Sequence, residues 1–159
     1  MKLPYCEGSW FSIPLRHGGF GVGLVARIAK KGKIFLGFYF GPNRSTSPKL
    51  SEVEKLTPQD TIGVYRTGDL ALINGDWPII GNATDWERTN WTVPFFYRHD
   101  EISRKIWKVV YSDSDPTIIT KEEEISYEEN STLARDSVFG AGAIELLLTK
   151  TIESSGKLY

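Results

Sequence analysis

Residues 10–40, WFSIPLRHGGFGVGLVARIAKKGKIFLGFYF, contain three apolar runs separated by two glycine-containing turns. Glycine reaches the positive φ values that tight turns require, so Gly18-Gly19 between two apolar runs is typical of a hairpin. Residues 29–33 form the second predicted turn. This segment therefore predicts three strands, at residues 10–15, 20–28 and 34–40, that pair as an antiparallel meander.

Individual residues refine the first two of these strands. Pro14 lacks an amide donor, so the first strand should lie at a sheet edge or break there. Alternation in the second strand places five side chains on one face: Phe20, Val22, Leu24, Ala26 and Ile28. Gly21 and Gly23 fall on the opposite face, where we expect another group to approach closely or the strand to bend.

The rest of the chain predicts short elements and one longer helix. We expect a helix at 50–56, a strand at 61–67, a short strand at 77–80, a hairpin of 94–98 with 105–111, and a helix at 141–152. Residues 69–76 fit either a helical turn or a loop, and residues 82–92 read as a polar loop containing two tryptophans. The predicted fold is α+β and mainly β: a strongly bent antiparallel sheet or partial barrel, a few short helices and a C-terminal helix, in a single domain over residues 1–159.

Composition indicates a soluble globular protein. The chain has 159 residues, 13% aromatic and 25% charged, which suits one domain with a sizeable core. Cys6 is the one cysteine and cannot form an internal disulfide. No apolar run resembles a signal peptide or is long enough to cross a bilayer. We therefore expect a cytoplasmic protein without a membrane partner.

The net charge of −1 conceals an asymmetry along the chain. Residues 1–50 hold eight Lys or Arg and one acid, whereas residues 113–159 hold ten acids and four Lys or Arg. Three explanations are open. The basic part binds nucleic acid, the acidic part binds a basic protein, or the two parts attract one another within the fold.

The sequence offers little for catalysis or for a cofactor. Its two histidines, His17 and His99, and its single cysteine show no spacing typical of a metal site. The glycines at 19, 21 and 23 lack the spacing of a dinucleotide-binding loop. We expect no enzyme, no metal, no cofactor and no small-molecule substrate. A hydrolase that uses His99 with nearby carboxylates remains an alternative.

The strongest candidate binding region is the acidic stretch, residues 113–129, which holds seven acids and one lysine. A dense negative surface speeds encounter with a basic partner, and aromatic residues commonly dominate interface energetics. The competing interpretation is a charged, mobile loop. The predicted contact residues are Asp113, Asp115, Glu122, Glu123, Glu124, Tyr127, Glu128 and Glu129.

A basic cluster near the second turn gives an alternative function. Arg27, Lys30, Lys31 and Lys33 lie close in sequence to aromatic strand residues, a combination that can bind single-stranded nucleic acid. The plainer interpretation is a solubilising turn beside core aromatics. The lysines in the turn therefore favour a solubilising role, and we expect no nucleic-acid partner. A nucleic-acid-binding β module that uses the basic first third of the chain is the second hypothesis.

Several of these segments resemble a known bacterial family. Residues 11–15 (FSIPL) followed by 19–25 (GFGVGLV), and later 77–81 (WPIIG) and 94–96 (PFF), are similar in order and separation to the immunity proteins numbered twenty-six. The resemblance covers roughly residues 8–110. It implies a partner, a cognate toxin of a polymorphic toxin system, which the protein would neutralise without catalysis. The matching residues look architectural and do not indicate where such a toxin would bind.

Overall fold

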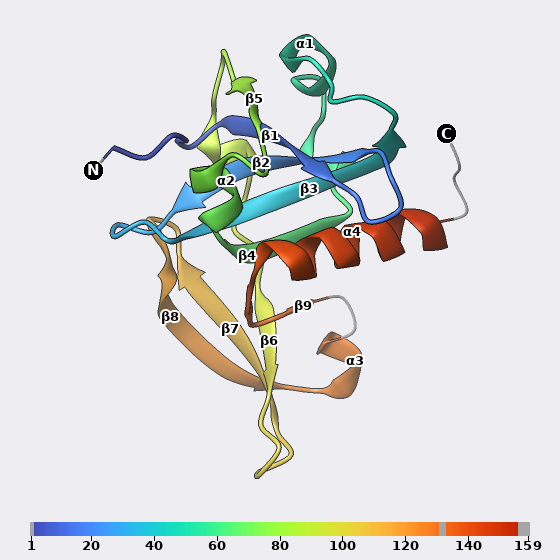
Figure 1. Cartoon of the computed structure of the whole chain (residues 1–159). Helices are drawn as coiled ribbons and strands as arrows, with labels where there is room; N and C mark the ends of the chain where they lie inside the picture. Colours follow the sequence, from blue (N-terminus) through green and yellow to red (C-terminus); the bar gives the residue numbers. More distant parts are fainter. Residues whose placement is uncertain (1, 131–132, 156–159) are drawn as a thin grey trace.

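The protein consists mainly of two β-sheets and a C-terminal helix (Figure 1). The structure is a computed structural model, and it describes residues 2–130 and 133–155. Within those residues the first sheet has six strands in the order β10-β4-β3-β2-β1-β5. They are β1 (Ser9–Pro14), β2 (Phe20–Ile28), β3 (Ile34–Arg44), β4 (Gly63–Gly68), β5 (Ile79–Asn82) and β10 (Val138–Phe139). The meander predicted from residues 10–40 is confirmed as β1, β2 and β3, which pair antiparallel in sequence order.

Turn chemistry explains why these three strands pair as they do. Gly18 and Gly19 adopt φ values of 96° and 80°, and Gly32 adopts 71°, a region of φ that favours glycine. Pro14 ends β1, as its missing amide predicts, and the neighbouring strand β5 pairs with β1 only as far as Phe11. The two glycine turns therefore fix the order of β1, β2 and β3 within the first sheet.

The second sheet has four strands in the described residues, in the order β8-β7-β6-β9. They are β6 (Phe96–His99), β7 (Ile106–Ser112), β8 (Asp115–Ile125) and β9 (Ala134–Arg135). The predicted hairpin is confirmed as β6 and β7. The mainly β class is also confirmed, but the strands divide between two sheets without closing a barrel, and the pairs β6–β9 and β4–β10 are parallel.

Short helices connect the strands, and one longer helix follows them. The short ones are α1 (Leu50–Val53), η1 (Pro58–Asp60), α2 (Leu70–Asn74), η2 (Arg88–Asn90) and α3 (Tyr127–Asn130). The helix expected at 50–56 ends earlier, at Val53 with Glu54 as its C-cap, and a separate turn, η1, starts at Pro58, where Thr57 and Asp60 cap each other. The C-terminal helix is confirmed as α4 (Ala141–Ser154). Among the described helices, none combines the length and the apolar character needed to span a bilayer.

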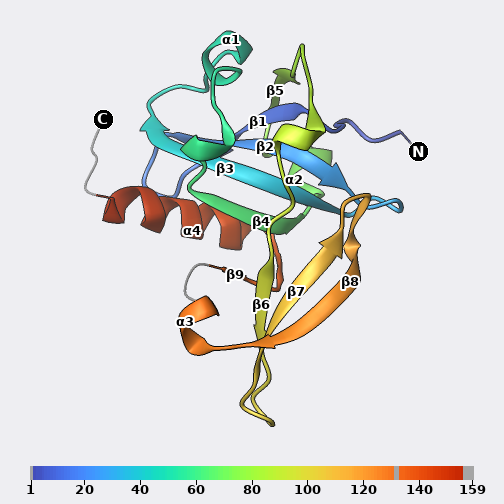
Figure 2. The same cartoon turned by 180° about the vertical axis from the view of Figure 1, so that it is seen from behind.

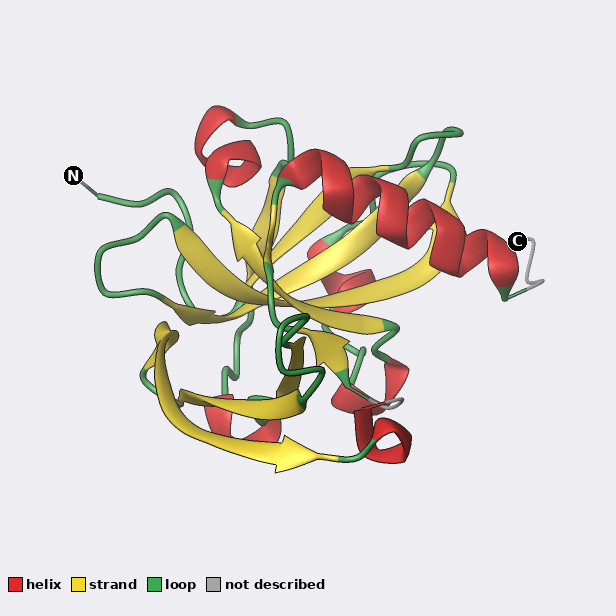
Figure 3. Cartoon of the chain, turned by 90° about the horizontal axis from the view of Figure 1, so that it is seen from below, coloured by secondary structure: helices red, strands yellow, loops and turns green. Residues whose placement is uncertain are grey.

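The first sheet is covered on both faces, as the view in Figure 3 shows. On one face α4 places Ile144, Leu148 and Ile152 against Phe11 and its neighbours. On the other face the second sheet packs against the first through a separate apolar cluster that includes Trp10, Leu24, Phe38, Phe96 and Val109. Figure 2 shows the β6–β8 sheet from behind, below the first sheet. The order of layers is helix, sheet, sheet.

One expectation about side-chain direction in β2 is wrong. A β-bulge between Val25 and Arg27 shifts the pairing with β3, so the alternation reverses there. Val22, Leu24 and Ala26 face the second sheet as expected, but Ile28 packs with the opposite core. The bulge leaves Arg27 buried at 2% exposure rather than in a solvent-facing basic cluster.

A buried arginine on β4 links the two sheets. Arg66 is 8% exposed and donates from Nε to the carbonyl oxygen of Pro116 at 2.8 Å and from Nη1 to Asp136 Oδ1 at 3.0 Å. Its guanidinium lies 4.1 Å from the ring centroid of Tyr111, whose hydroxyl also donates to Asp136. Charged hydrogen bonds of this kind position the second sheet on the first.

Candidate functional site

The acidic stretch is a strand rather than a loop over most of its length. Glu122, Glu123 and Glu124 lie on β8, which pairs antiparallel with β7 and forms one edge of the second sheet. The expectation of a charged, mobile loop is therefore wrong for residues 115–125, because cross-strand pairing with β7 orders them. An edge strand carries unpaired backbone groups on its outer side, which makes it a natural place for a partner to bind.

The carboxylates on β8 have cationic neighbours across the strands. Glu122 accepts from Arg98 Nη1 at 2.9 Å, and Glu123 lies 2.7 Å from Lys108 Nζ. These contacts, led by the hydrogen bonds from Arg98 and Lys108, lower the pKa of Glu122 and of Glu123 respectively. Glu124 lies 3.9 Å from Lys105 Nζ. Because side chains alternate along a strand, Glu122 and Glu124 lie on one face of β8 and Glu123 lies on the other. Carboxylates meet cations on both faces, and such exposed pairs add little stability.

The predicted residues of α3 extend this surface. Tyr127 is 67% exposed, so a large aromatic side chain stands next to the carboxylates without apolar cover. Glu129 Oε1 accepts from the backbone amide of Ser126 at 3.2 Å and so supports the start of α3. Glu128 is exposed on the same helix. We name Glu122, Glu123, Glu124, Tyr127, Glu128 and Glu129 together the β8 surface.

The remaining predicted contact residues, Asp113 and Asp115, hold the fold together. Asp115 is 4% exposed, and its Oδ1 accepts from the amide of Thr117 at 2.9 Å while its Oδ2 accepts from the amide of Lys30 at 3.2 Å. Asp113 keeps an exposed side chain but pairs with two arginines. Both carboxylates connect the start of β8 to the first sheet.

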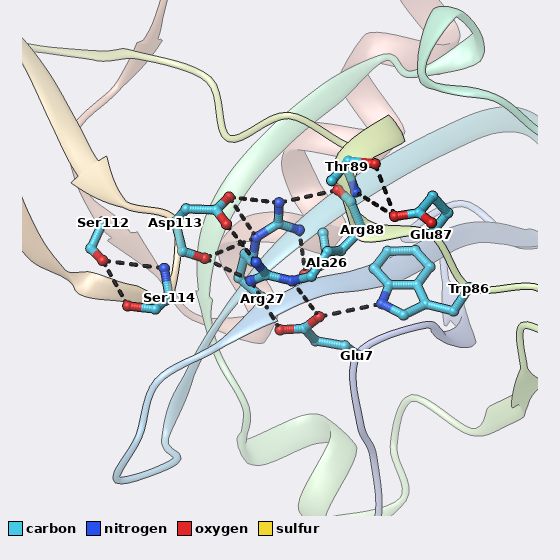
Figure 4. Close-up of polar contacts among 10 residues, drawn as sticks. All are labelled: Glu7, Ala26, Arg27, Trp86, Glu87, Arg88, Thr89, Ser112, Asp113 and Ser114. Atoms are coloured by element: carbon cyan, nitrogen blue, oxygen red, sulfur yellow. Dashed lines mark hydrogen bonds and ion pairs between the residues drawn. The ribbon is translucent and has the colours of Figure 1, made fainter.

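Figure 4 shows the arginine network, which consists of Glu7, Arg27, Arg88 and Asp113. Arg27 donates from Nη2 to Asp113 Oδ1 at 2.8 Å and from Nη1 to the carbonyl oxygen of Ala26 at 2.7 Å. Arg88 donates from Nε to Glu7 Oε1 at 3.0 Å and from Nη2 to the Asp113 carbonyl oxygen at 2.7 Å. Basic and acidic parts of the chain therefore attract one another within the fold, one of the three explanations for the charge asymmetry.

The arginine network should make the free energy of unfolding fall at acid pH, when Asp113 becomes protonated. Hydrogen bonding from Arg27 lowers the pKa of this carboxyl below its ordinary 3.8. A lowered folded-state pKa gives stability that is complete above the unfolded-state pKa and is lost as pH falls through the folded-state value. We expect Asp113→Asn to be less stable than wild type at about pH 6, and this difference to shrink by about pH 3, measured by urea unfolding.

Asp76→Asn is the matched control, since Asp76 is an exposed carboxylate after α2. Its effect should be small and should not change between the two pH values. A difference between wild type and Asp113→Asn that stays constant on acidification would contradict the assignment.

The histidines and the cysteine lie apart from one another. His17 Nδ1 is 2.6 Å from Glu153 Oε2 at an exposed position, His99 is exposed at the end of β6, and Cys6 is exposed. Residues 2–130 and 133–155 contain no group of three His, Cys, Asp or Glu side chains placed to hold a metal ion.

Arg27, which the sequence placed in the basic cluster, belongs to the arginine network instead. Arg27 is buried and bound to Asp113, which leaves Lys30, Lys31 and Lys33 exposed in the single turn between β2 and β3. A nucleic-acid groove needs cations along its length and aromatic faces open to bases. Phe35 and Phe38 are instead 0% and 5% exposed, so the nearby aromatics belong to the core.

A hollow that the sequence did not indicate lies beside the arginine network. It has a volume of about 690 Å³, and we name it the tryptophan hollow. Its walls include Trp10, Phe38, Glu54, Asp85, Trp86 and Trp91. The feature of the sequence that could have pointed to the hollow is the pair of tryptophans in the polar segment 82–92, which we interpreted only as a loop. Residues far apart in the chain form it, so spacing alone could not reveal it.

Comparison with known protein families gave a match. A family model described as immunity protein 26 matches residues 6–108, which include all the named residues of the tryptophan hollow and end within β7. The acidic stretch lies outside the matched segment. A search of curated proteins and a search of solved structures each found no match.

Proposed function

The chain belongs to the immunity protein 26 family, and we propose on this basis that it binds and neutralises a cognate toxin of a bacterial polymorphic toxin system. Inhibition would require complementary surfaces and no catalysis. The protein would act in the cytoplasm of the producing cell and its kin, where it would protect them in bacterial competition. The family match over residues 6–108 is the observation that carries this proposal.

We place the toxin contact on the β8 surface. Its carboxylates would orient a basic partner, and Tyr127, exposed at 67%, would supply an aromatic contact. A nuclease is the toxin class we favour, because the basic cleft that holds a nucleic-acid backbone also suits carboxylates. Asp113 and Asp115 would support this surface from below rather than touch the toxin, since they fix the start of β8.

Co-expression with the toxin encoded beside its gene tests both statements. The wild-type protein should restore growth and co-purify with the toxin. In a variant with Glu122→Lys and Glu124→Lys, four units of charge are changed on β8. We expect about tenfold slower association at low ionic strength, because like charges would then meet across the interface. Stopped-flow or surface plasmon resonance would measure the rate.

Asp76→Lys and Glu101→Lys together change the same charge at exposed positions outside the β8 surface. This control should associate at close to the wild-type rate. Failure of the wild-type protein to protect cells or bind the toxin would overturn the function. Equal association rates for the two double variants would instead move the contact away from the β8 surface.

A further inference from the structure

The tryptophan hollow has the charge and shape of a binding site that lies outside the β8 surface. Among the described residues that line it, the only ionisable side chains are Glu54 and Asp85, so it has two carboxylates and no cation. No ion pair is formed by either side chain within residues 2–130 and 133–155. The interior of the hollow is therefore negative and aromatic.

Two polar atoms in its walls are buried without hydrogen-bond partners. They are Glu54 Oε1 and Trp10 Nε1, and Trp10 as a whole is 2% exposed. A buried polar atom without a partner costs free energy, and a charged oxygen costs more than a neutral donor. Neither atom is open to the hollow, so a ligand there would reach the Glu54 carboxylate through its other oxygen or after that side chain turned. The Trp10 indole N–H is a donor and would stay without a partner beside a ligand that only donates.

The aromatic walls are held in place before any ligand arrives. Trp86 stacks on Trp91 with an interplanar angle of 24°, and Trp91 meets Trp10 edge-on at 82°. The indole Nε1 of Trp86 donates to Glu7 Oε1 at 3.3 Å, which ties this wall to the arginine network. Gly8 lies beneath the Trp86 ring, where an added Cβ would come within 3.1 Å. Preorganised walls lower the entropic cost of binding.

We propose that the tryptophan hollow binds a cationic side chain, an arginine guanidinium, presented by a polypeptide partner. Trp86 is the partly exposed tryptophan of the hollow, whereas Trp10 and Trp91 are buried behind it. An accessible tryptophan ring attracts a guanidinium through cation–π interaction and planar stacking, and carboxylates accept its fork of donors. The volume of about 690 Å³ exceeds one guanidinium, so the arginine would enter with neighbouring residues of its chain. Nucleotides and other anions are disfavoured by the two carboxylates. Identifying the partner as the toxin rests on the proposed function.

The binding chemistry can be tested without the toxin. The intact protein would be titrated with N-acetyl-arginine amide and with its neutral isostere N-acetyl-citrulline amide, following the indole N–H signals by NMR. We expect saturable shifts of the Trp10, Trp86 and Trp91 signals with the arginine compound, and at least tenfold weaker binding of the citrulline compound. A short peptide with a central arginine should bind more tightly than the single amino-acid amide. Equal binding of the two amides would overturn the proposal.

Single variants test whether the arginine compound binds in the tryptophan hollow. Glu54→Gln keeps the side-chain shape and removes the charge, and we expect about tenfold weaker binding of the arginine compound. Asp76→Asn removes an exposed charge outside the hollow and should leave binding unchanged. A Glu54→Gln variant that folds, judged by its NMR spectrum, and binds arginine as well as wild type does would also overturn the proposal.

Experiments with the toxin distinguish the arginine-binding proposal from the proposed function. If the wild-type protein protects cells and Glu54→Gln protects equally with unchanged toxin affinity, the hollow does not contact the toxin while the function stands. If the wild-type protein fails to protect but the arginine compound binds selectively, the function is wrong and the site remains. A loss of toxin affinity in Glu54→Gln together with weaker arginine binding would support both.

Discussion

Phe11→Ala is expected to lower the free energy of unfolding by about 4 kcal/mol. Phe11 is fully buried and lies where the aromatic side chains of the helix-side core meet. Its ring stacks on Trp77 at 5.6 Å with an interplanar angle of 6°, and it meets Phe35 edge-on at 5.7 Å. Alanine would leave a cavity among large rings that cannot collapse to fill it. Urea unfolding followed by near-ultraviolet circular dichroism measures the loss.

Gly23 provides a control that depends on the same ring. An added Cβ at Gly23 would lie 2.3 Å from Phe11 Cζ, so Gly23→Ala alone should cost about 1–3 kcal/mol through overpacking. In the Phe11→Ala background that clash disappears, and Gly23→Ala should cost clearly less. The two changes are therefore expected to couple. Additive effects in the double variant would show that the ring does not occupy the space beside Gly23.

Arg27→Ala is expected to lower the free energy of unfolding by about 3 kcal/mol. Its side chain is 2% exposed and donates to Asp113 and to the carbonyl oxygens of Ala26 and Arg88. Removing it leaves buried acceptors without donors and opens a cavity between the sheets. Because Asp113 is itself 63% exposed, water can solvate that carboxylate, and this limits the loss. Equilibrium urea unfolding gives the value.

Arg88→Ala is the matched comparison, because Arg88 binds the same carboxylate from a position where its side chain is 35% exposed. Solvent screening there reduces the expected loss to about 1 kcal/mol. Arg27→Lys should fall between wild type and Arg27→Ala, since lysine keeps the charge but cannot make the planar fork. Equal losses for Arg27→Ala and Arg88→Ala would show that burial does not distinguish the two arginines.

The arginine network changes how the charge along the chain should be understood. The excess of bases in residues 1–50 and of acids in residues 113–159 is partly neutralised inside the molecule, through the ion pair of Arg27 with Asp113. On β8, four nearby cations (Arg98, Lys105, Lys108 and Lys121) offset the three glutamates. A partner would therefore meet a patterned surface of modest net charge, which favours orientation over long-range attraction.

The predicted contact residues show which features of the candidate site can be inferred from sequence and which cannot. The acidic stretch is visible as composition, and the β8 surface derived from it remains a prediction. Burial of Asp115 at 4% exposure could not be seen, because nothing local marks it as the acceptor for the Lys30 amide in the distant β2–β3 turn. The tryptophan hollow was missed for the same reason: Trp10, Glu54 and Trp86 meet only after the chain has folded.

Local chemistry alone determined the β1–β3 meander, the β6–β7 hairpin and the α4 stripe. Glycine turns and side-chain periodicity act between near neighbours, so their effect can be read along the chain. Only the tertiary structure decided the division into two sheets, the bulge that buries Arg27, and the meeting of three tryptophans with two carboxylates in one hollow. These features depend on contacts between residues distant in sequence, whose free energy no local pattern encodes.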